Sequence, residues 1–110
     1  MTKEELREYR SIKEELCQIE LKLQEVERYE LEPEIVRPLR ALYRDKLAEL
    51  IERQLDIEEA LEVLSSTERM LMRLRYFEGK EWLDICEAIH YEWTQTHRIH
   101  ARALKKIQDL

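Results

Sequence analysis

The stretch that decides the fold is residues 65–79, SSTERMLMRLRYFEG. Ser65, followed three residues later by Glu68, forms the pattern of a capping box, in which each side chain bonds a backbone amide at the start of a helix. Gly79 is the only glycine of the chain and stands where a helix end favours a left-handed residue. One helix is therefore expected between these two signals. Its inward side chains are expected to be Met70, Leu71, Leu74 and either Tyr76 or Phe77.

Two more helices are expected downstream of Gly79. The first carries apolar residues at steps of three, one and three, namely Trp82, Ile85, Cys86 and Ile89. Residues 90–92 interrupt it, and the last helix is expected from about Trp93, with Thr96, Ile99, Ala103, Ile107 and also Leu104 as inward candidates. Three short helices with a tight turn between the second and the third predict a helix-turn-helix domain over residues 65–110.

Residues 1–64 predict a helical hairpin. The first helix, from about Thr2 to Tyr29, has a seam with alternating steps of three and four: Tyr9, Ile12, Leu16, Ile19, Leu23 and Val26. Pro33 should end it, and a connection is expected to close near Pro38. The second helix continues the pattern with Leu47, Leu50, Ile57, Leu61 and Leu64. The expected architecture is therefore all-α, a long antiparallel hairpin followed by a three-helix domain.

The apolar face of the second helix is wider than one partner helix can cover. Leu42, Ile51 and Leu55 flank the seam, which predicts further packing against the C-terminal domain or a second copy of the chain. We favour a homodimer through the hairpin. Gln54, the polar member of the seam, either fixes the register and partner number or simply occupies an exposed position, and both interpretations stay open.

Charge is distributed unevenly along the chain. The net charge is -6, yet residues 66–110 hold eight Lys or Arg against seven Asp or Glu, whereas residues 1–65 hold eleven against eighteen. The basic residues of the C-terminal part gather in the last helix, as a DNA-binding helix requires. Apolar residues make up 44% of the chain and recur regularly, which excludes a disordered protein.

The cysteines and the hydropathy indicate a reduced, intracellular environment. Cys17 and Cys86 stand far apart, without a metal-binding spacing, at positions expected to face the core. No stretch reaches the length of a transmembrane helix, and the chain is charged from Lys3 onward, so neither a membrane span nor a signal peptide is expected. We expect a cytoplasmic protein that does not bind membranes.

The C-terminal residues resemble region 4 of bacterial sigma factors, which reads a promoter element. The resemblance rests on Leu64-Ser65 with Glu68-Arg69, on residues 74–79, on Asp84-Ile85, and on Ile99-His100 with residues 103–107. With its charged helical N-terminal half, Trp82 and the aromatic start of the last helix, the chain is similar to phage transcriptional regulators of the ArpU and RinA type. This resemblance implies a DNA-binding regulator of phage genes in the cytoplasm of a bacterial host cell.

Three residues depart from the sigma pattern where that pattern meets DNA. His90 stands in place of a turn glycine and must adopt a left-handed conformation. Glu92 replaces the usual Ser or Thr cap; its carboxylate suits the helix dipole but brings negative charge towards DNA. His97 stands where the pattern commonly has arginine.

The last helix is expected to enter the major groove, where side chains near its start reach base edges. The base-contacting candidates are Trp93, Thr94, Gln95, His97 and Arg98. The phosphate-contacting candidates are Arg102, Lys105 and Lys106, with Arg75, Lys80 and Arg73 from the supporting helix and turn. Trp93 has an equally plausible structural role, packing across the turn on Tyr91 or Trp82, and Trp82 is expected in the core.

Other kinds of site have little support. His97 and His100 have a helical spacing that suits a metal, but no third ligand stands nearby, so no metal and no cofactor are expected. No phosphate-binding glycine loop or nucleophile motif is present, and no enzyme is expected. The predicted function is a sequence-specific regulator that binds double-stranded DNA as a dimer. Alternatives are a small terminase-like subunit for phage DNA packaging, or a sigma-like module that binds RNA polymerase.

Overall fold

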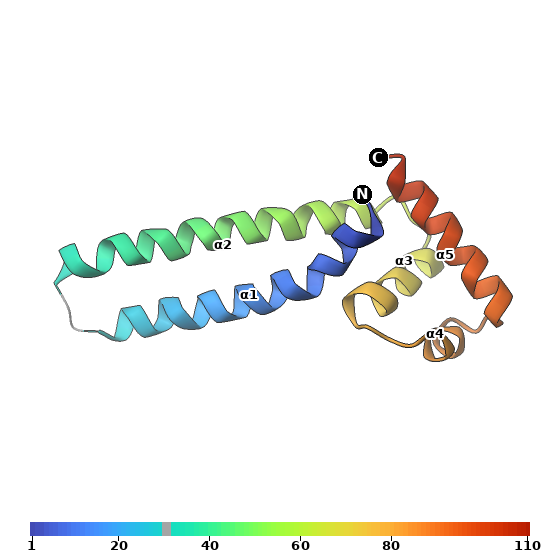
Figure 1. The fold of residues 1–110 in the computed structure, drawn as a ribbon, viewed down its shortest axis with the longest axis horizontal. Coiled ribbons are helices and arrows are strands. Elements are labelled where there is room, and N and C mark those ends of the chain that lie inside the picture. Colours follow the sequence, from blue (N-terminus) through green and yellow to red (C-terminus); the bar gives the residue numbers. More distant parts are fainter. Residues whose placement is uncertain (30–31) are drawn as a thin grey trace. The chain divides into compact units, whose positions relative to one another are not determined.

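The computed structural model describes residues 1–29 and 32–110, and its regular structure is entirely helical (Figure 1). The elements are α1 (Lys3–Arg28), α2 (Pro33–Leu61), α3 (Ser66–Met72), the π-helical segment η1 (Arg73–Phe77), α4 (Trp82–Ile89) and α5 (Trp93–Gln108). The all-α prediction is confirmed. None of the helices within the described residues has an apolar stretch long enough to cross a membrane.

The chain forms two compact units. One consists of Met1–Arg10 together with Asp56–Leu110, and the other of Ser11–Leu55. Sequence patterns predicted a boundary between residues 64 and 65, at the end of the hairpin. In the structure, the first turns of α1 and the last turns of α2 instead belong to the same unit as the three C-terminal helices.

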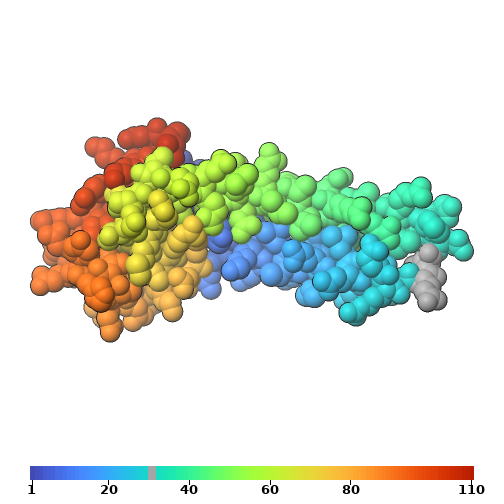
Figure 2. Space-filling model, turned by 180° about the vertical axis from the view of Figure 1, so that it is seen from behind, coloured from blue at the N-terminus to red at the C-terminus, as the bar shows by residue number. Residues whose placement is uncertain are grey.

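Within Ser11–Leu55, the helices α1 and α2 run antiparallel and touch along this segment (Figures 1 and 2). The predicted seam of α1 is buried or half-buried from Ile12 to Val26. Val36 and Leu50 of α2 are buried in the same unit. Two charged contacts join the helices at their surface: Arg40 Nε lies 2.8 Å from Glu27 Oε1, and the Lys22 ammonium lies 6.0 Å from the ring centre of Tyr43.

The second helix begins earlier than predicted. Pro33 is its first residue and Pro38 lies inside it, so the expected connection through Pro38 is wrong. A proline is well suited to the first helical position, where no amide donor is needed. Pro38 lies in the second turn, where it removes one backbone bond, to the carbonyl of Glu34, and the helix continues. Glu30 and Leu31, which also belong to the predicted connection, lie outside the described residues.

Several side chains of this unit do not face its core. Cys17 is exposed, against the prediction that it faces inward, because it follows the buried Leu16 by one position and so points about 100° away around the helix. Leu42, Ile51 and Leu55 are exposed as well, with Leu42 at 63%. The widened apolar face of α2 is thus present but uncovered in a single chain.

The unit of Met1–Arg10 and Asp56–Leu110 is built around α3, α4 and α5, and α5 contacts both of the other two helices (Figure 1). Its core contains Leu71, Met72, Ile85, Ala103 and Ile107, each fully buried. Helices α1 and α2 add further buried side chains to this unit, namely Leu6, Ile57, Ala60 and Leu61. The ring of Tyr9 also stacks on the ring of Phe77, with 3.7 Å between their centres.

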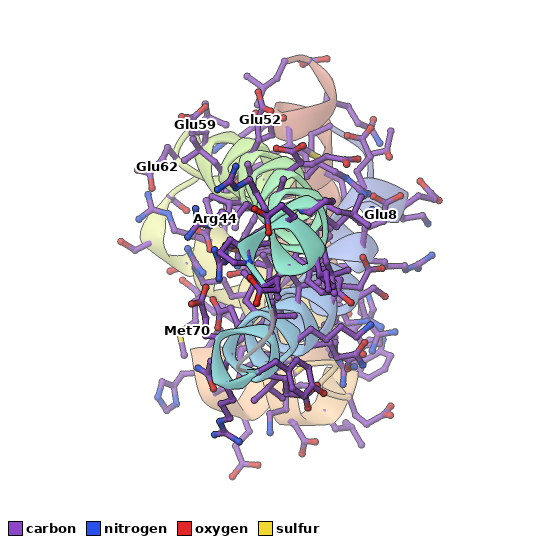
Figure 3. The ribbon with its side chains drawn as sticks, turned by 90° about the vertical axis from the view of Figure 1, so that its left-hand side faces the viewer. Glu8, Arg44, Glu52, Glu59, Glu62 and Met70 are labelled. Carbon is purple, nitrogen blue, oxygen red and sulfur yellow. The ribbon has the colours of Figure 1, made fainter. Side chains whose placement is uncertain are left out.

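The inward face of α3 differs by one residue from the prediction. Met72 is fully buried, whereas Met70 is 45% exposed and points away from the helices (Figure 3). Glu68, Leu71, Met72 and Tyr76 share one face at steps of three, one and four, and Met70 lies on the other side. Beyond Met72 the helix widens into η1, where the amide of Glu78 bonds the carbonyl of Arg73 at 3.0 Å.

Candidate nucleic-acid interface

The start of α3 is fixed by the predicted capping box. The Ser65 amide donates to Glu68 Oε1 at 2.8 Å, and the Glu68 amide donates to Ser65 Oγ at 3.3 Å. Lys106 Nζ of α5 donates to the same Glu68 oxygen at 2.7 Å. Burial raises the pKa of Glu68, but the hydrogen bonds from Lys106 and Ser65 outweigh it and lower the pKa below its ordinary value. This glutamate therefore joins the start of α3 to the end of α5.

The turn between α4 and α5 has the conformation that the sequence predicted for His90. Its φ of 61° and ψ of 40° are left-handed, and its amide bonds the carbonyl of Cys86. The extended Glu92 then opens α5 through its backbone carbonyl, which accepts from the Thr96 amide at 2.9 Å, while its side chain forms no capping bond. Glu92 therefore does not cap through its carboxylate, the role considered for it from the sequence.

Helix α5 has one buried face and one exposed face. Thr96, Ile99, Ala103 and Ile107 are buried, as predicted from their spacing. The opposite face carries Thr94, Arg98, Arg102 and Lys105, all exposed, at steps of four, four and three. Within residues 1–29 and 32–110, no carboxylate forms an ion pair with Arg98, Arg102 or Lys105. This face therefore presents three uncompensated cations in a row.

The first turn of α5 exposes a large aromatic side chain. Trp93 is 51% exposed, and its ring centre lies 4.6 Å from that of His97. On its other side His97 lies 4.4 Å from Trp82, and its Nε2 is buried without a hydrogen-bond partner. His97 thus packs between two tryptophans, whereas Trp93 and the exposed Gln95 remain available at the surface.

The predicted phosphate contacts fall into separate groups. Arg102 and Lys105 lie on the exposed face of α5, but Lys106 is in the ion pair with Glu68. Arg75 donates through Nη1 to the carbonyl of Lys80 at 2.9 Å, and its guanidinium lies 4.8 Å from the ring centre of Trp82. The side chain of Lys80 is exposed. Arg75 and Lys80 are thus neighbours at the end of η1.

Arg73 has a structural role in this unit. Its guanidinium forms an ion pair with Glu58 at 2.5 Å and lies 5.4 Å from the ring centre of Phe77. Tyr9 also donates to Glu58, at 2.9 Å. Burial raises the pKa of Glu58, but the hydrogen bonds from Arg73 and Tyr9, with the charge of Arg73, lower it below the ordinary value. Arg73 therefore fastens η1 to α2 and is not a free contact for DNA.

Sequence reasoning missed the partner of His100. The Tyr76 hydroxyl lies 2.7 Å from His100 Nε2, and Trp82 packs on the same imidazole at 4.8 Å between ring centres. Burial, followed by the positive charges of His97, Lys3, Arg75 and Arg7, lowers the pKa of His100 to about 4. Burial raises the pKa of Tyr76. From the sequence, the spacing of His97 and His100 suggested no role for His100 other than binding a metal. Tyr76 lies 24 positions away in the sequence, so only the fold brings it to His100.

The residues that the structure describes contain no group of three or more His, Cys, Asp or Glu placed to hold a metal ion. In comparisons with known proteins, no family model matches the chain, and no curated protein or solved structure is significantly similar to it.

Proposed function

We propose that this protein is a sequence-specific DNA-binding transcription regulator of the phage ArpU and RinA type, which the chain resembles, with a C-terminal domain similar to sigma factor region 4. The observation that carries the proposal is the exposed face of α5, where Arg98, Arg102 and Lys105 lack ion-pair partners among the described residues. This face follows directly on the left-handed turn at His90. A helix with such a face has the shape and charge that major-groove binding requires.

The proposed contacts divide into two kinds. Trp93, Thr94, Gln95 and Arg98 lie in the first two turns of α5 and read base edges, with Arg98 suited to guanine and Gln95 to adenine. Arg102 and Lys105 lie further along and bind phosphate, which positions the helix without specifying a sequence. His97 positions Trp93, because the His97 ring packs between the rings of Trp93 and Trp82.

The proposed regulator acts as a homodimer through the unit Ser11–Leu55. Ile35, Leu39 and Leu42 are exposed on one flank of α2 at steps of four and three, the spacing of a helix–helix seam. A second copy of the same helix would cover them, which gives a symmetric interface. Sedimentation equilibrium tests this step: Leu42→Glu should yield a monomer, whereas Leu21→Glu, an exposed leucine of α1, should leave the dimer intact.

Selection from a random duplex library, followed by fluorescence anisotropy with the selected duplex, tests the DNA-binding proposal. Arg98→Ala should weaken binding by about 1–3 kcal/mol, or roughly 5- to 150-fold, and relax the preference at one base pair. Arg102→Ala should weaken all sequences alike and reduce the salt dependence by about one counterion. Arg44→Ala, which removes an exposed cation of α2, is the matched control and should bind like the wild type.

Two results would contradict the proposal. One is a library from which the wild-type protein enriches no sequence. The other is an Arg98→Ala, Gln95→Ala double variant that binds the selected duplex as well as the Arg44→Ala control does, since the face of α5 would then make no contact. Circular dichroism of each variant verifies that the helices are retained.

A further inference from the structure

A pocket of about 330 Å³ lies within the unit formed by Met1–Arg10 and Asp56–Leu110. Three arginines, Arg7 and Arg10 from α1 and Arg75 from η1, line it together with Tyr76 and Gly79. Like charges repel one another, and an anion placed between them offsets this repulsion. Such a gathering of guanidinium groups around one hollow is therefore an unusual arrangement for side chains that only face solvent.

Each guanidinium has a neighbour that positions it, and none of these neighbours is a carboxylate. Arg75 is bonded to the Lys80 carbonyl, and Arg7 lies 5.9 Å from the ring centre of Tyr76. Arg10 packs so closely on Gly79 that a Cβ there would lie 2.5 Å from its Nη1. Within the described residues no acidic side chain forms an ion pair with any of the three arginines. Their positive charges therefore remain available to a ligand.

The ionisable groups beside the pocket respond to the same positive field. Arg7, Arg75 and Lys3 contribute, after burial and His97, to the lowered pKa of His100. Arg7 and Arg75 also oppose the burial that raises the pKa of Tyr76, and Glu4 is the carboxylate that acts on this tyrosine in the other direction. More cationic than anionic groups thus act on Tyr76, at the wall of the pocket.

We infer that Arg7, Arg10 and Arg75 form a binding pocket for a phosphate group. Guanidinium groups bind phosphate oxygens in a bidentate manner, and three of them around one hollow can contact several oxygens at once. The volume is near the lower end for small-molecule sites and suits a phosphate with its adjoining sugar. The phosphate comes either from a DNA backbone, which would rest on the proposed function, or from a free phosphate-bearing molecule.

Two probes test the pocket and distinguish these sources: pyrophosphate, followed by calorimetry at constant ionic strength, and the selected DNA duplex, followed by anisotropy against salt. The test variant is Arg7→Ala with Arg10→Ala. Its control is Lys13→Ala, which removes an exposed cation of the same helix outside the pocket. The double variant should weaken pyrophosphate binding about tenfold or more, or about 1.4 kcal/mol. The control should bind as the wild type does.

The DNA arm identifies the source of the phosphate. If backbone phosphate occupies the pocket, the double variant lowers the salt slope of DNA binding by about two, and pyrophosphate competes with the duplex. If a free phosphate compound occupies it, the variant loses pyrophosphate binding and keeps the wild-type DNA slope. An unchanged response in both arms overturns the pocket. Arg98→Ala distinguishes the failure of the phosphate pocket from the failure of the proposed function. Arg98 lies outside the pocket, so this variant should retain pyrophosphate binding whether or not the protein binds DNA.

Discussion

The hydroxyl of Tyr76 lies 2.7 Å from Nε2 of His100, which ties η1 to the middle of α5. The lowered pKa of this histidine means that its imidazole is neutral near pH 7, and the tautomer decides whether Nε2 accepts from the tyrosine hydroxyl or donates to it. The same imidazole packs against Trp82, which in turn contacts His97. The contacts of α5 with η1 and α4 therefore meet at one imidazole.

Acidification should weaken this unit between pH 6.5 and 4. The pKa of His100 is about 4 in the folded chain and 6.5 ordinarily, so the folded state disfavours the charged form. Its stabilising contribution is complete above pH 6.5 and is lost as the pH falls towards 4. Urea unfolding at several pH values should show this slope, and His100→Phe should flatten it. An NMR titration that gives His100 a pKa near 6.5 would contradict the assignment.

Lys106→Met should destabilise the protein by about 1–3 kcal/mol, because the carboxylate of Glu68, a residue only 2% exposed, loses its ion-pair partner. Lys105→Met is the matched control and should change stability by less than about 0.5 kcal/mol. Because the pKa of Glu68 is lowered from 4.5, the wild-type protein should also lose part of its stability as the pH falls below 4.5 and Glu68 is protonated. The Lys106 variant lacks the ion pair, so its stability should fall less over the same pH range. Equal stabilities for the two lysine variants would refute the role given to Glu68.

Substitutions at His90 should separate backbone strain from side-chain chemistry. The residue has a left-handed φ of 61°, which a β-branched side chain adopts only at a cost of about 1–2 kcal/mol. His90→Val should therefore lower the free energy of unfolding, whereas His90→Gly should keep it or raise it slightly. Chemical denaturation measures both. A glycine variant as unstable as the valine variant would show that the imidazole, and not the backbone, matters at this turn.

Tyr9→Phe should cost about 0.5–1.5 kcal/mol, because it removes the hydrogen bond to Glu58 at 2.9 Å and keeps the ring stacked on Phe77. Tyr9→Ala removes both interactions and should cost clearly more. Thermal unfolding of the two variants gives the comparison. Should Tyr9→Phe prove as damaging as Tyr9→Ala, the ring stacking would contribute nothing and the hydroxyl everything.

Local signals in the sequence predicted the local structure well. The capping box at Ser65, the left-handed Gly79 and His90, and the buried spacing of α5 each follow from interactions within a few residues. The wrong expectations concern where a helix begins and which residues of a helix face the core. Pro38 was taken as a boundary because its local cost in a helix is high. Met70 was predicted to face inward but is exposed, whereas Met72, which directly precedes η1, is buried.

The candidate interface was predictable only in part, for the same reason. The exposed face of α5 follows from helical spacing, so Arg98, Arg102 and Lys105 lie on the exposed side that a DNA-contacting face requires. Lys106 looks identical to Lys105 in the sequence, and only the fold brings Glu68 to it across 38 positions. Arg7 and Arg10 offered a weak signal, because with Lys3 they share one face of α1, but nothing local placed that face against Arg75.

The packing of Tyr9 on Phe77 and of Met1–Arg10 into the unit with Asp56–Leu110 makes the helix-turn-helix a discontinuous domain. As the chain leaves the ribosome, Leu6 and Tyr9 emerge long before the segment that covers them, and their burial waits until residues 56–110 have been synthesised. A fragment starting at Ser65 would carry the whole motif and still expose part of its own core. The folding of α3, α4 and α5 therefore depends on the base of the hairpin, and the module cannot be transplanted without it.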